Sequence, residues 1–449
     1  MQEYITELSK YTIAALMVLY TLGSFLTLSD KVRKGRAVYL IQNLFLFLIQ
    51  LLMFADLALV NKDMEYVFFY VFVQIFLLAV VIMVPLIYEK ANRLLLNNMC
   101  MLLGIGLCVI SRLSFRKAIR QYIIVLMSLA VSLFLPWLLS RIRFWKKLTW
   151  AYGLVGAALL GIVLILGEIT HGSRISFTIA DISFQPSEFV KVLFVFFLAG
   201  ALWEKADFVR VALTALIAGA HVILLVLSRD LGSALIFFVG YVFVVFAATR
   251  NYLYLLAGAV GGSGAAWAAY RLFAHVRTRV LAWQDPWTYI DAQGFAVTQS
   301  LFAIGSGNWF GMGLSQGDPK AIPYVEMDFA FSSVCEELGV IFGICVILLT
   351  FACFLEMLRI AVRIRDRFYQ LIVYGISIMY IFQIFLTIGG GIKLIPLTGV
   401  TLPFISYGGS SVMTTMIMFF LIQGIYIRLQ QEGAKHSGGK AGKSGKKQT

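Results

Sequence analysis

Residues 274–333 read AHVRTRVLAWQDPWTYIDAQGFAVTQSLFAIGSGNWFGMGLSQGDPKAIPYVEMDFAFSS and interrupt a chain that is otherwise made of long apolar runs. No apolar run in this stretch is long enough to cross a membrane, which takes about 20 residues. Two arginines, Arg277 and Arg279, lie at its entry. Five carboxylates follow them: Asp285, Asp291, Asp318, Glu326 and Asp328. Short connections suffice to join membrane helices, so a long polar loop with charges of both signs predicts a functional region. Its glycines alone are equally consistent with ordinary turns.

The composition indicates a polytopic membrane protein. Of the 449 residues, 60% are hydrophobic and 13% are charged, whereas soluble domains carry about 25% charged residues. The net charge of +14 does not indicate a nucleic-acid partner, because the basic residues lie mainly in short loops and in the tail, where they orient a membrane protein. The five cysteines form no CxxC pair and the four histidines are scattered, so they predict no metal site. The N-terminus MQEYITELSK has no basic n-region, so no cleavable signal peptide is expected.

Thirteen apolar stretches have about the length of a membrane span. They lie near residues 11–29, 37–60, 65–88, 96–112, 120–140, 148–168, 188–204, 208–227, 230–248, 252–273, 334–356, 368–390 and 408–428. We therefore expect an all-α polytopic membrane protein with one long loop, between the tenth and eleventh spans. The tail at 431–449 is basic and of low complexity, so we expect it to be disordered and attracted to the anionic inner leaflet.

Basic loops predict the orientation. Four Lys or Arg residues lie in each of the stretches 31–36, 141–147 and 359–367. Alternating spans put these loops and the tail on one side, and the positive-inside rule makes that side cytoplasmic. A fourth basic stretch, 112–120, falls on the outer side as an exception, and we interpret it as a possible contact for anionic lipid.

The same alternation places the loops near 169–187, 274–333 and 391–407 outside. The ends of the spans that carry Glu188, Asp230, Glu336 and Glu337 also face that side. Ionisable groups at the edge of the hydrocarbon are costly unless they are paired or solvated. Each could cap a helix, but their collection on one face predicts a shared polar site.

Five motifs resemble those of the SEDS family, the FtsW, RodA and SpoVE proteins of bacterial cell-wall synthesis. They are FQPSEFVK (184–191), RDLGSALI (229–236), a run from Arg279 through QSLFAIGSG to GMGL, DFAFSSVCEELG (328–339) and PLTGVTLPFISYGGSS (396–411). The resemblance covers residues 93–430 and implies a core of ten spans. Residues 1–92 then form an addition of three spans, which places the N-terminus outside.

The resemblance implies a peptidoglycan glycosyltransferase of the bacterial cytoplasmic membrane, serving cell division, elongation or sporulation. Such enzymes polymerise lipid II, a disaccharide-pentapeptide on undecaprenyl diphosphate, into glycan strands outside the membrane. The implied partner is a class B penicillin-binding protein, which cross-links the product. A transporter that moves lipid-linked precursor across the bilayer and a non-catalytic scaffold for the penicillin-binding protein are the alternatives. A transporter should place its charges near the bilayer midplane, whereas here they collect at one face.

Glycan polymerisation requires a general base for the attacking sugar hydroxyl. In the SEDS family, the proposed base is an aspartate in a pattern like DPxxDPxGxGY. Here Asp285 and Pro286 match the first pair, but Tyr289 stands where the second aspartate is expected and Asp291 lies two residues later. We expect Asp291 to be the base, because tyrosine is a poor base near neutral pH, with Asp285 as the alternative. Either aspartate could instead serve the turns beside Pro286 and Gly294.

The departing diphosphate requires cationic partners. We expect them to be Arg277, Arg279, Lys191 and Lys393, with Arg174 as a weaker candidate. Arginine suits phosphate because its planar fork can donate two hydrogen bonds. Lys191 could instead pair with Glu188 on one face of a helix.

The other residues expected at the substrate site lie in the matching motifs. They are Glu188, Asp230, Gln299, Ser300, Asp328, Ser406 and Tyr407. No cofactor is predicted with certainty, although Asp328, Glu336 and Glu337 could hold a divalent cation.

Overall fold

The structure is a computed structural model that describes residues 2–29, 35–142, 144–170, 173–179 and 182–444. Its long helices are α1 (Gln2–Leu26), α3 (Arg36–Asn61), α4 (Glu65–Ile87), α5 (Arg93–Leu113), α6 (Phe115–Leu133), α8 (Thr149–Leu166), α9 (Pro186–Leu202), α10 (Phe208–Leu227), α11 (Leu231–Thr249), α12 (Leu253–Leu272), α15 (Ala330–Arg363), α16 (Arg367–Gly391) and α17 (Gly409–Ser444). Shorter helices are α7 (Leu135–Arg141), η1 (Trp145–Leu148), α13 (Ala274–Gln284), α14 (Phe295–Gly307) and η2 (Pro319–Ala321).

These helices confirm the all-α polytopic fold. Within the described residues, 11 helices are long and apolar enough to cross a membrane. Helices α9 and α12 occupy the other two predicted spans, 188–204 and 252–273. Helix α15 begins at Ala330, four residues before its predicted start near 334.

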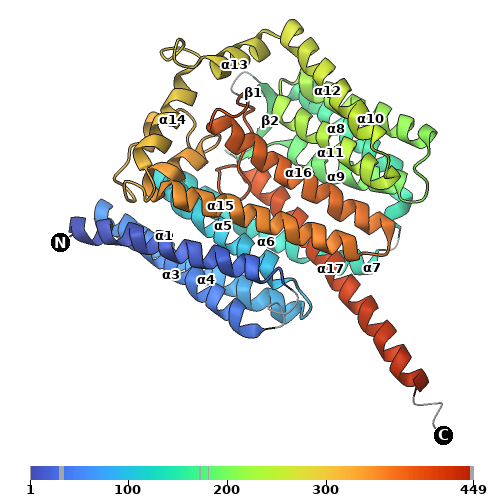
Figure 1. The fold of residues 1–449 in the computed structure, drawn as a ribbon, viewed down its shortest axis with the longest axis horizontal. Coiled ribbons are helices and arrows are strands. Elements are labelled where there is room, and N and C mark those ends of the chain that lie inside the picture. The colour runs from blue at the N-terminus through green and yellow to red at the C-terminus, as the bar shows by residue number, and fades with distance from the viewer. Residues whose placement is uncertain (1, 30–34, 143, 171–172, 180–181, 445–449) are drawn as a thin grey trace.

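Helix α5, predicted only as a short span, lies at the centre of the bundle. It packs against α3, α4, α6 and α15, and nearly all of its side chains are buried. Helices α1, α3 and α4, which form the predicted addition at 1–92, lie together along one side of the bundle (Figure 1). There α1 contacts α15, whereas α3 and α4 contact α5.

Basic stretches meet at one end of the bundle. Lys146 Nζ lies 3.0 Å from Asp366 Oδ2, which joins the stretches 141–147 and 359–367. Arg359 Nη1 donates to the carbonyl of Leu28 at 2.6 Å, just before the stretch 31–36. Lys31, Arg33, Lys34 and Arg143 lie outside the described residues. These contacts bring the described parts of the stretches 141–147 and 359–367 together with Leu28 on a common face, which is called the basic face below.

The basic stretch at 112–120, which departs from the positive-inside rule, is explained by its ion pairs. Arg112 Nε lies 2.9 Å from Glu337 Oε1, and Lys117 pairs with Glu326. Two of the four cations are therefore neutralised by carboxylates of 326–337, so they need not obey a rule that concerns free loop charge.

The long loop closes a break in α15. Gly339 has φ 88°, which interrupts the helix. Backbone N–H groups of Met312 and Gly313 donate to the carbonyls of Glu336 and Glu337 at 2.9 Å, and those of Val340 and Ile341 donate to Asn308 and Trp309 at 3.0 and 3.1 Å. The segment 308–313 thus satisfies the backbone groups that the break frees, as irregular backbone at membrane depth requires. A Cβ on Gly311 would lie 2.3 Å from the Glu337 carbonyl oxygen, so this glycine serves close backbone approach.

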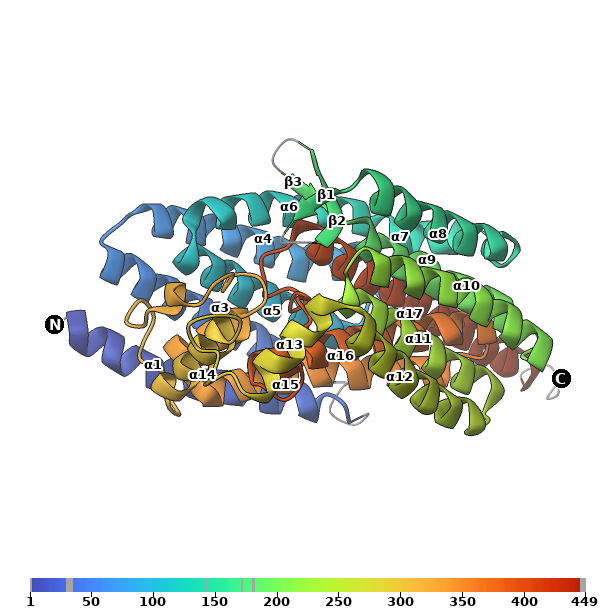
Figure 2. The same ribbon diagram turned by 90° about the horizontal axis from the view of Figure 1, so that it is seen from above.

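Two features differ from the expectation. Strands β1 (Glu168–Thr170), β2 (Ser173–Ile179) and β3 (Ile182–Phe184) form a small antiparallel sheet, which protrudes beside α8 and α9 (Figure 2). Its alternating Ile and Phe residues suit a strand. In addition, α17 continues to Ser444, so the tail predicted to be disordered is helical over 431–444. No proline interrupts this stretch, and its backbone hydrogen bonds continue those of the last span.

Candidate functional site

A buried ion pair lies in the first turns of α9, at the end of the bundle opposite the basic face. Lys191 Nζ lies 2.7 Å from Glu188 Oε2, and both side chains are almost fully buried. Lys191 also donates to Gln383 Oε1 on α16 at 2.7 Å. This is the i, i+3 pairing that the sequence left open. Buried charges require such partners because removing them from water is costly.

Asp230 lies in the same polar cluster and caps α11. It accepts from the backbone N–H of Ser233 at 3.0 Å. Its other oxygen accepts from Gln185 Nε2 at 3.2 Å and from Ser187 Oγ at 3.3 Å. Asp230 therefore caps α11 and also links it to the start of α9 through Gln185 and Ser187.

Arg279 of α13 and Asp328 approach each other over the loop at 391–407. Arg279 Nη1 donates to the carbonyl of Thr398 at 3.1 Å. A Cβ placed on Gly399 would lie 3.8 Å from Asp328 Oδ2 and 3.9 Å from Arg279 Nη2. Burial raises the pKa of Asp328 to about 6, an effect that Arg279 opposes and Glu326 reinforces. Burial also lowers the pKa of Arg279, and the nearby charges of Asp328 and Asp230 oppose that shift.

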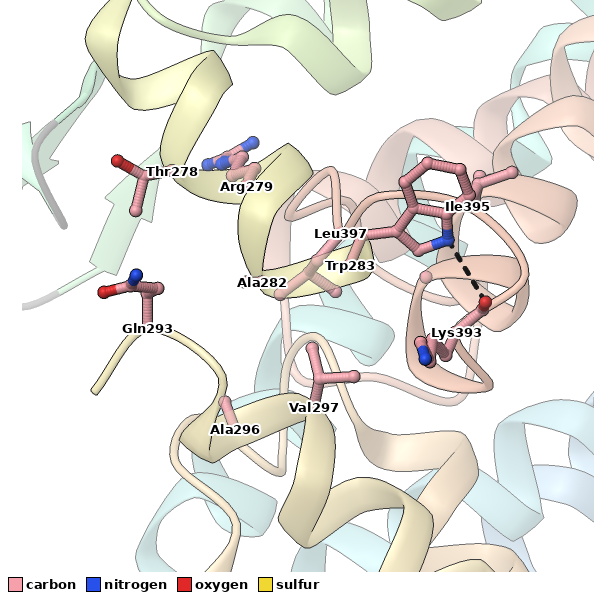
Figure 3. A pocket seen from close by; sticks show the side chains of 11 residues that line it. Thr278, Arg279, Ala282, Trp283, Gln293, Ala296, Val297, Lys393, Ile395 and Leu397 are labelled. Carbon is pink, nitrogen blue, oxygen red and sulfur yellow. Dashed lines mark hydrogen bonds between the residues drawn. The ribbon is translucent and has the colours of Figure 1, made fainter. Parts of the chain in front are cut away.

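Arg279 and Lys393 line one pocket, a space of about 440 Å³ that is partly open to solvent. Helices α13 and α14 and the loop after α16 supply its walls, which include the apolar Ala282 and Leu397 (Figure 3). Trp283 Nε1 donates to the Lys393 carbonyl at 3.2 Å. Lys393 itself has a left-handed conformation, with φ 60°. Two of the predicted diphosphate partners thus share a concave, partly apolar site.

The two candidate bases do not line this pocket. Asp285 is exposed and accepts from the N–H and Oγ1 of Thr288 at 3.2 and 2.6 Å. These bonds hold the pKa of Asp285 below its usual value, the Thr288 hydroxyl contributing most. Asp291 is exposed too, two residues before Gln293, which does line the pocket. Arg277 is also exposed and stands apart from the pocket lining.

Three other predicted residues position the loops around Arg279. Ser300 Oγ bonds to Ser332 Oγ at 2.6 Å and donates to the Gly391 carbonyl at 2.8 Å. Ser406 Oγ donates to the Met327 carbonyl at 2.5 Å, and the Tyr407 N–H donates to the Glu326 carbonyl at 2.7 Å. The last two bonds hold the segment that carries Asp328. Gln299 is half-buried, and the side chain of Arg174, on β2, lies outside the described residues.

Sequence reasoning missed Gln383, Trp283 and Thr398. Gln383 is a polar side chain inside an apolar span, and that signal could have identified it. Besides its bond to Lys191, it donates to the Thr401 carbonyl at 3.0 Å. No pattern marks Trp283 or Thr398, because their contribution is a hydrogen bond between the long loop and the loop at 391–407.

The carboxylates considered for a divalent cation do not form a ligand set. In the described ranges, no group of three or more His, Cys, Asp or Glu side chains is placed to hold a metal ion. Glu336 Oε1 instead accepts from the Asp318 N–H at 2.8 Å, and Glu337 pairs with Arg112. Asp328 faces Arg279 rather than either glutamate.

The family model for the FtsW, RodA and SpoVE cell cycle proteins matches residues 92–431, which is most of the chain. The chain belongs to the SEDS family. Peptidoglycan glycosyltransferase RodA of Mycobacterium leprae is 31% identical over 357 residues, covering 74% of this chain and 77% of the relative. Stage V sporulation protein E of Bacillus subtilis is 33% identical over 318 residues, covering 68% and 85%.

A solved chain from a peptidoglycan synthase complex also resembles the fold. That structure is described as showing the structural coordination of polymerization and crosslinking by the complex. The TM-score is 0.65 with 26% identity, and the match covers 76% of this chain and 99% of that chain. Helices α1, α3 and α4 lie before the residues that the SEDS family model matches.

Proposed function

We propose that this chain is a peptidoglycan glycosyltransferase that polymerises lipid II on the outer face of the bacterial cytoplasmic membrane. The observation that carries the proposal is the shared pocket of Arg279 and Lys393, because two cations in a concave site suit a diphosphate. The names of the curated relatives support the activity. The basic face, which the positive-inside rule makes cytoplasmic, lies at the other end of the bundle and supports an outward-facing site.

The reaction makes specific demands on these residues. A sugar hydroxyl attacks the anomeric carbon of a second lipid-linked sugar, and the bond from that carbon to the diphosphate oxygen breaks. Negative charge grows on the leaving diphosphate, where Arg279 and Lys393 would hold it. The hydroxyl proton passes to a carboxylate. The buried cluster of Glu188, Lys191 and Asp230 would hold α9, α11 and α16 in fixed positions relative to one another.

Asp291 is our proposed base and Asp285 the alternative. Hydrogen bonds from Thr288 stabilise the charged form of Asp285, which makes it a weaker base. Asp291 is exposed and lies two residues before Gln293, which lines the pocket. Substrate would have to bring its hydroxyl to this loop.

A class B penicillin-binding protein is the proposed partner. The similar solved chain belongs to a synthase complex that coordinates polymerization with crosslinking, and glycan strands without crosslinks would not make a wall. The proposed pair would work in the same membrane.

The test is polymer formation from labelled lipid II by the purified protein, with and without a class B partner. We expect Arg279→Ala to reduce the rate by about 100-fold or more, as loss of one preorganised charge-stabilising donor does. The matched control is Arg271→Ala, an exposed arginine eight residues earlier that does not line the pocket. It should leave the rate within about twofold, because an exposed charge away from the pocket contributes little.

Substitution of the two aspartates one at a time tests which of them is the general base. Loss of polymer with Asp291→Ala alone would support Asp291, and loss with Asp285→Ala alone would transfer the role to Asp285. No polymer from the unmodified chain under any partner condition would contradict the enzyme and favour the scaffold, with Tyr289 as the reason. Movement of labelled lipid across vesicles without polymer would favour the transporter.

A further inference from the structure

A second hollow lies at the basic face, far from the proposed active site. The end of α7, η1, the start of α16 and the last span of α17 surround a space of about 1040 Å³, part of which is open to solvent. The proposed glycosyl transfer uses none of the residues that line it.

Two partly exposed ion pairs face this hollow. Lys146 Nζ bonds to both carboxylate oxygens of Asp366, at 3.0 and 3.1 Å. Arg428 Nε lies 3.0 Å from Glu432 Oε1. Side-chain exposure is 30% and 31% for the first pair and 40% and 53% for the second, so both positive and negative groups are accessible to a ligand.

Aromatic rings complete the wall. The Arg428 guanidinium carbon lies 4.6 Å from the centre of the Tyr369 ring, and Arg428 Nη1 donates to the Tyr369 hydroxyl at 2.8 Å. Trp145 lines the hollow beside Lys146. The Tyr369 ring thus holds the Arg428 guanidinium at the wall of the hollow through a cation–π contact.

The depth of the hollow matches the membrane interface. The apolar spans next to it end at Arg141 and begin at Arg367, close to its lining residues Ile142 and Asp366. Trp137 and Phe144, close in sequence to its lining residues Ser140 and Trp145, are exposed, and aromatic side chains favour the headgroup region.

We propose that this hollow binds the head group of a zwitterionic phospholipid that carries a primary amine. Its phosphate would lie against Lys146 and Arg428, and its ammonium group against Glu432 and Asp366. A purely anionic head group would meet two carboxylates, and a free cation would meet the lysine and arginine. A head group with both charges can bridge the two ion pairs and meet an opposite charge at each end.

The experiment measures lipid retained by the purified full-length protein. Protein is equilibrated in nanodiscs with equal phosphatidylethanolamine and phosphatidylglycerol, transferred to mild detergent, and its bound lipid is counted by native mass spectrometry. We expect a preference for phosphatidylethanolamine. Glu432→Gln and Arg428→Gln should each reduce its retention by about threefold to tenfold, the effect of one charge-assisted contact.

The matched controls are Glu204→Gln and Arg210→Gln. These residues form a comparable exposed pair, 3.6 Å apart, between the connection after α9 and the first turn of α10, and they do not line the hollow. They should leave retention unchanged. A parallel measurement with soluble glycerophosphoethanolamine tests whether the head group alone binds. Saturable binding that Glu432→Gln weakens would support the proposal.

Equal retention of the two lipids, a preference for phosphatidylglycerol, or equal losses in the control variants would each overturn the proposal. Glu432 is exposed, so its variant should fold, and an unchanged unfolding temperature confirms this. The readout is independent of lipid II polymerisation.

Discussion

At the residue scale, Asp328 and Arg279 depend on each other's charge. Asp328 has a pKa of about 6, raised by burial. Above that pH it is a carboxylate that favours the Arg279 guanidinium and helps to hold it at the pocket. Below that pH it is neutral and Arg279 loses this partner. The charge state of a residue outside the pocket lining therefore governs the cation inside it.

Polymerisation should decline as the pH falls through about 6, because protonated Asp328 no longer orients Arg279. The measurement is the initial rate of polymer formation between about pH 5 and pH 8. Asp328→Asn should lower the rate at every pH in this range and remove its decline near pH 6. If the variant still shows the decline, a group other than Asp328 causes it.

The same shift acts on stability with a definite sign. An unfolded chain would ionise Asp328 near 3.8, its ordinary value, whereas the folded protein retains the proton up to about 6. Between these values the folded state binds more protons, so this residue makes stability fall as the pH rises.

Removing one partner of the buried pair of Glu188 and Lys191 should destabilise the folded protein. Lys191→Met leaves Glu188 buried without its counter-charge, which should destabilise the protein by about 3–5 kcal/mol. The unfolding temperature of the detergent-solubilised protein measures this, and Glu188→Gln combined with Lys191→Met should recover part of the loss.

The matched control is the pair of Glu7 and Lys10 on α1. It has the same i, i+3 spacing and a 2.6 Å separation, but Glu7 is 57% exposed. Lys10→Met should therefore cost about 1 kcal/mol or less. Equal losses for the two lysine variants would contradict the role of burial.

At the element scale, the break in α15 joins the long loop to the bundle. Gly339 allows the positive φ at the break, and a Cβ there would lie 2.4 Å from the backbone nitrogen of Gly311. The four backbone bonds between 308–313 and 336–341 all depend on this approach. The loop that carries the candidate bases is anchored through the same contact.

Gly339→Ala should destabilise the protein by about 2 kcal/mol or more, because alanine disfavours the left-handed conformation and clashes with backbone. Thermal unfolding measures this. Gly305→Ala is the control, since a Cβ at Gly305 in α14 meets nothing within 4 Å. It should be neutral or stabilise by about 0.5–1 kcal/mol, and a similar loss at both sites would refute the account.

At the scale of the whole molecule, polar contacts within the membrane join the three N-terminal helices to the core. Asn98 of α5 accepts from Ser24 at 2.9 Å and from Tyr20 at 3.3 Å. Asn97 of α5 donates to Gln42 Oε1 of α3 at 3.4 Å. These buried groups would be left without partners if the helices separated, which is costly in lipid.

A chain that begins at residue 89 should therefore be less stable than the full chain, although the SEDS family model matches only from residue 92. We expect a lower unfolding temperature and more aggregation during detergent extraction, measured by size-exclusion chromatography. Co-expression of residues 1–88 as a separate chain should restore both properties. Equal unfolding temperatures for the short and full chains would contradict the prediction.

The sequence determined the helices and predicted which of their ends share a face. Apolar runs of span length fold into membrane helices because no other structure satisfies the backbone in lipid, so all thirteen predicted spans correspond to helices. The basic stretches at 141–147 and 359–367 marked one common face in the same way. Glu188 and Lys191 were predictable as a pair because their spacing places them on one side of a helix.

Only the tertiary structure decided which polar residues meet. Arg279 and Lys393 are 114 positions apart in the sequence, and the Trp283 bond to the Lys393 carbonyl joins the two segments that bring them to one pocket. Likewise, Arg112 and Glu337 pair between helices, which no local pattern specifies. The small sheet at 168–184 and the break at Gly339 also escaped prediction. Local sequence governs the formation of a span, whereas packing among spans and loops governs which of their charged ends come together.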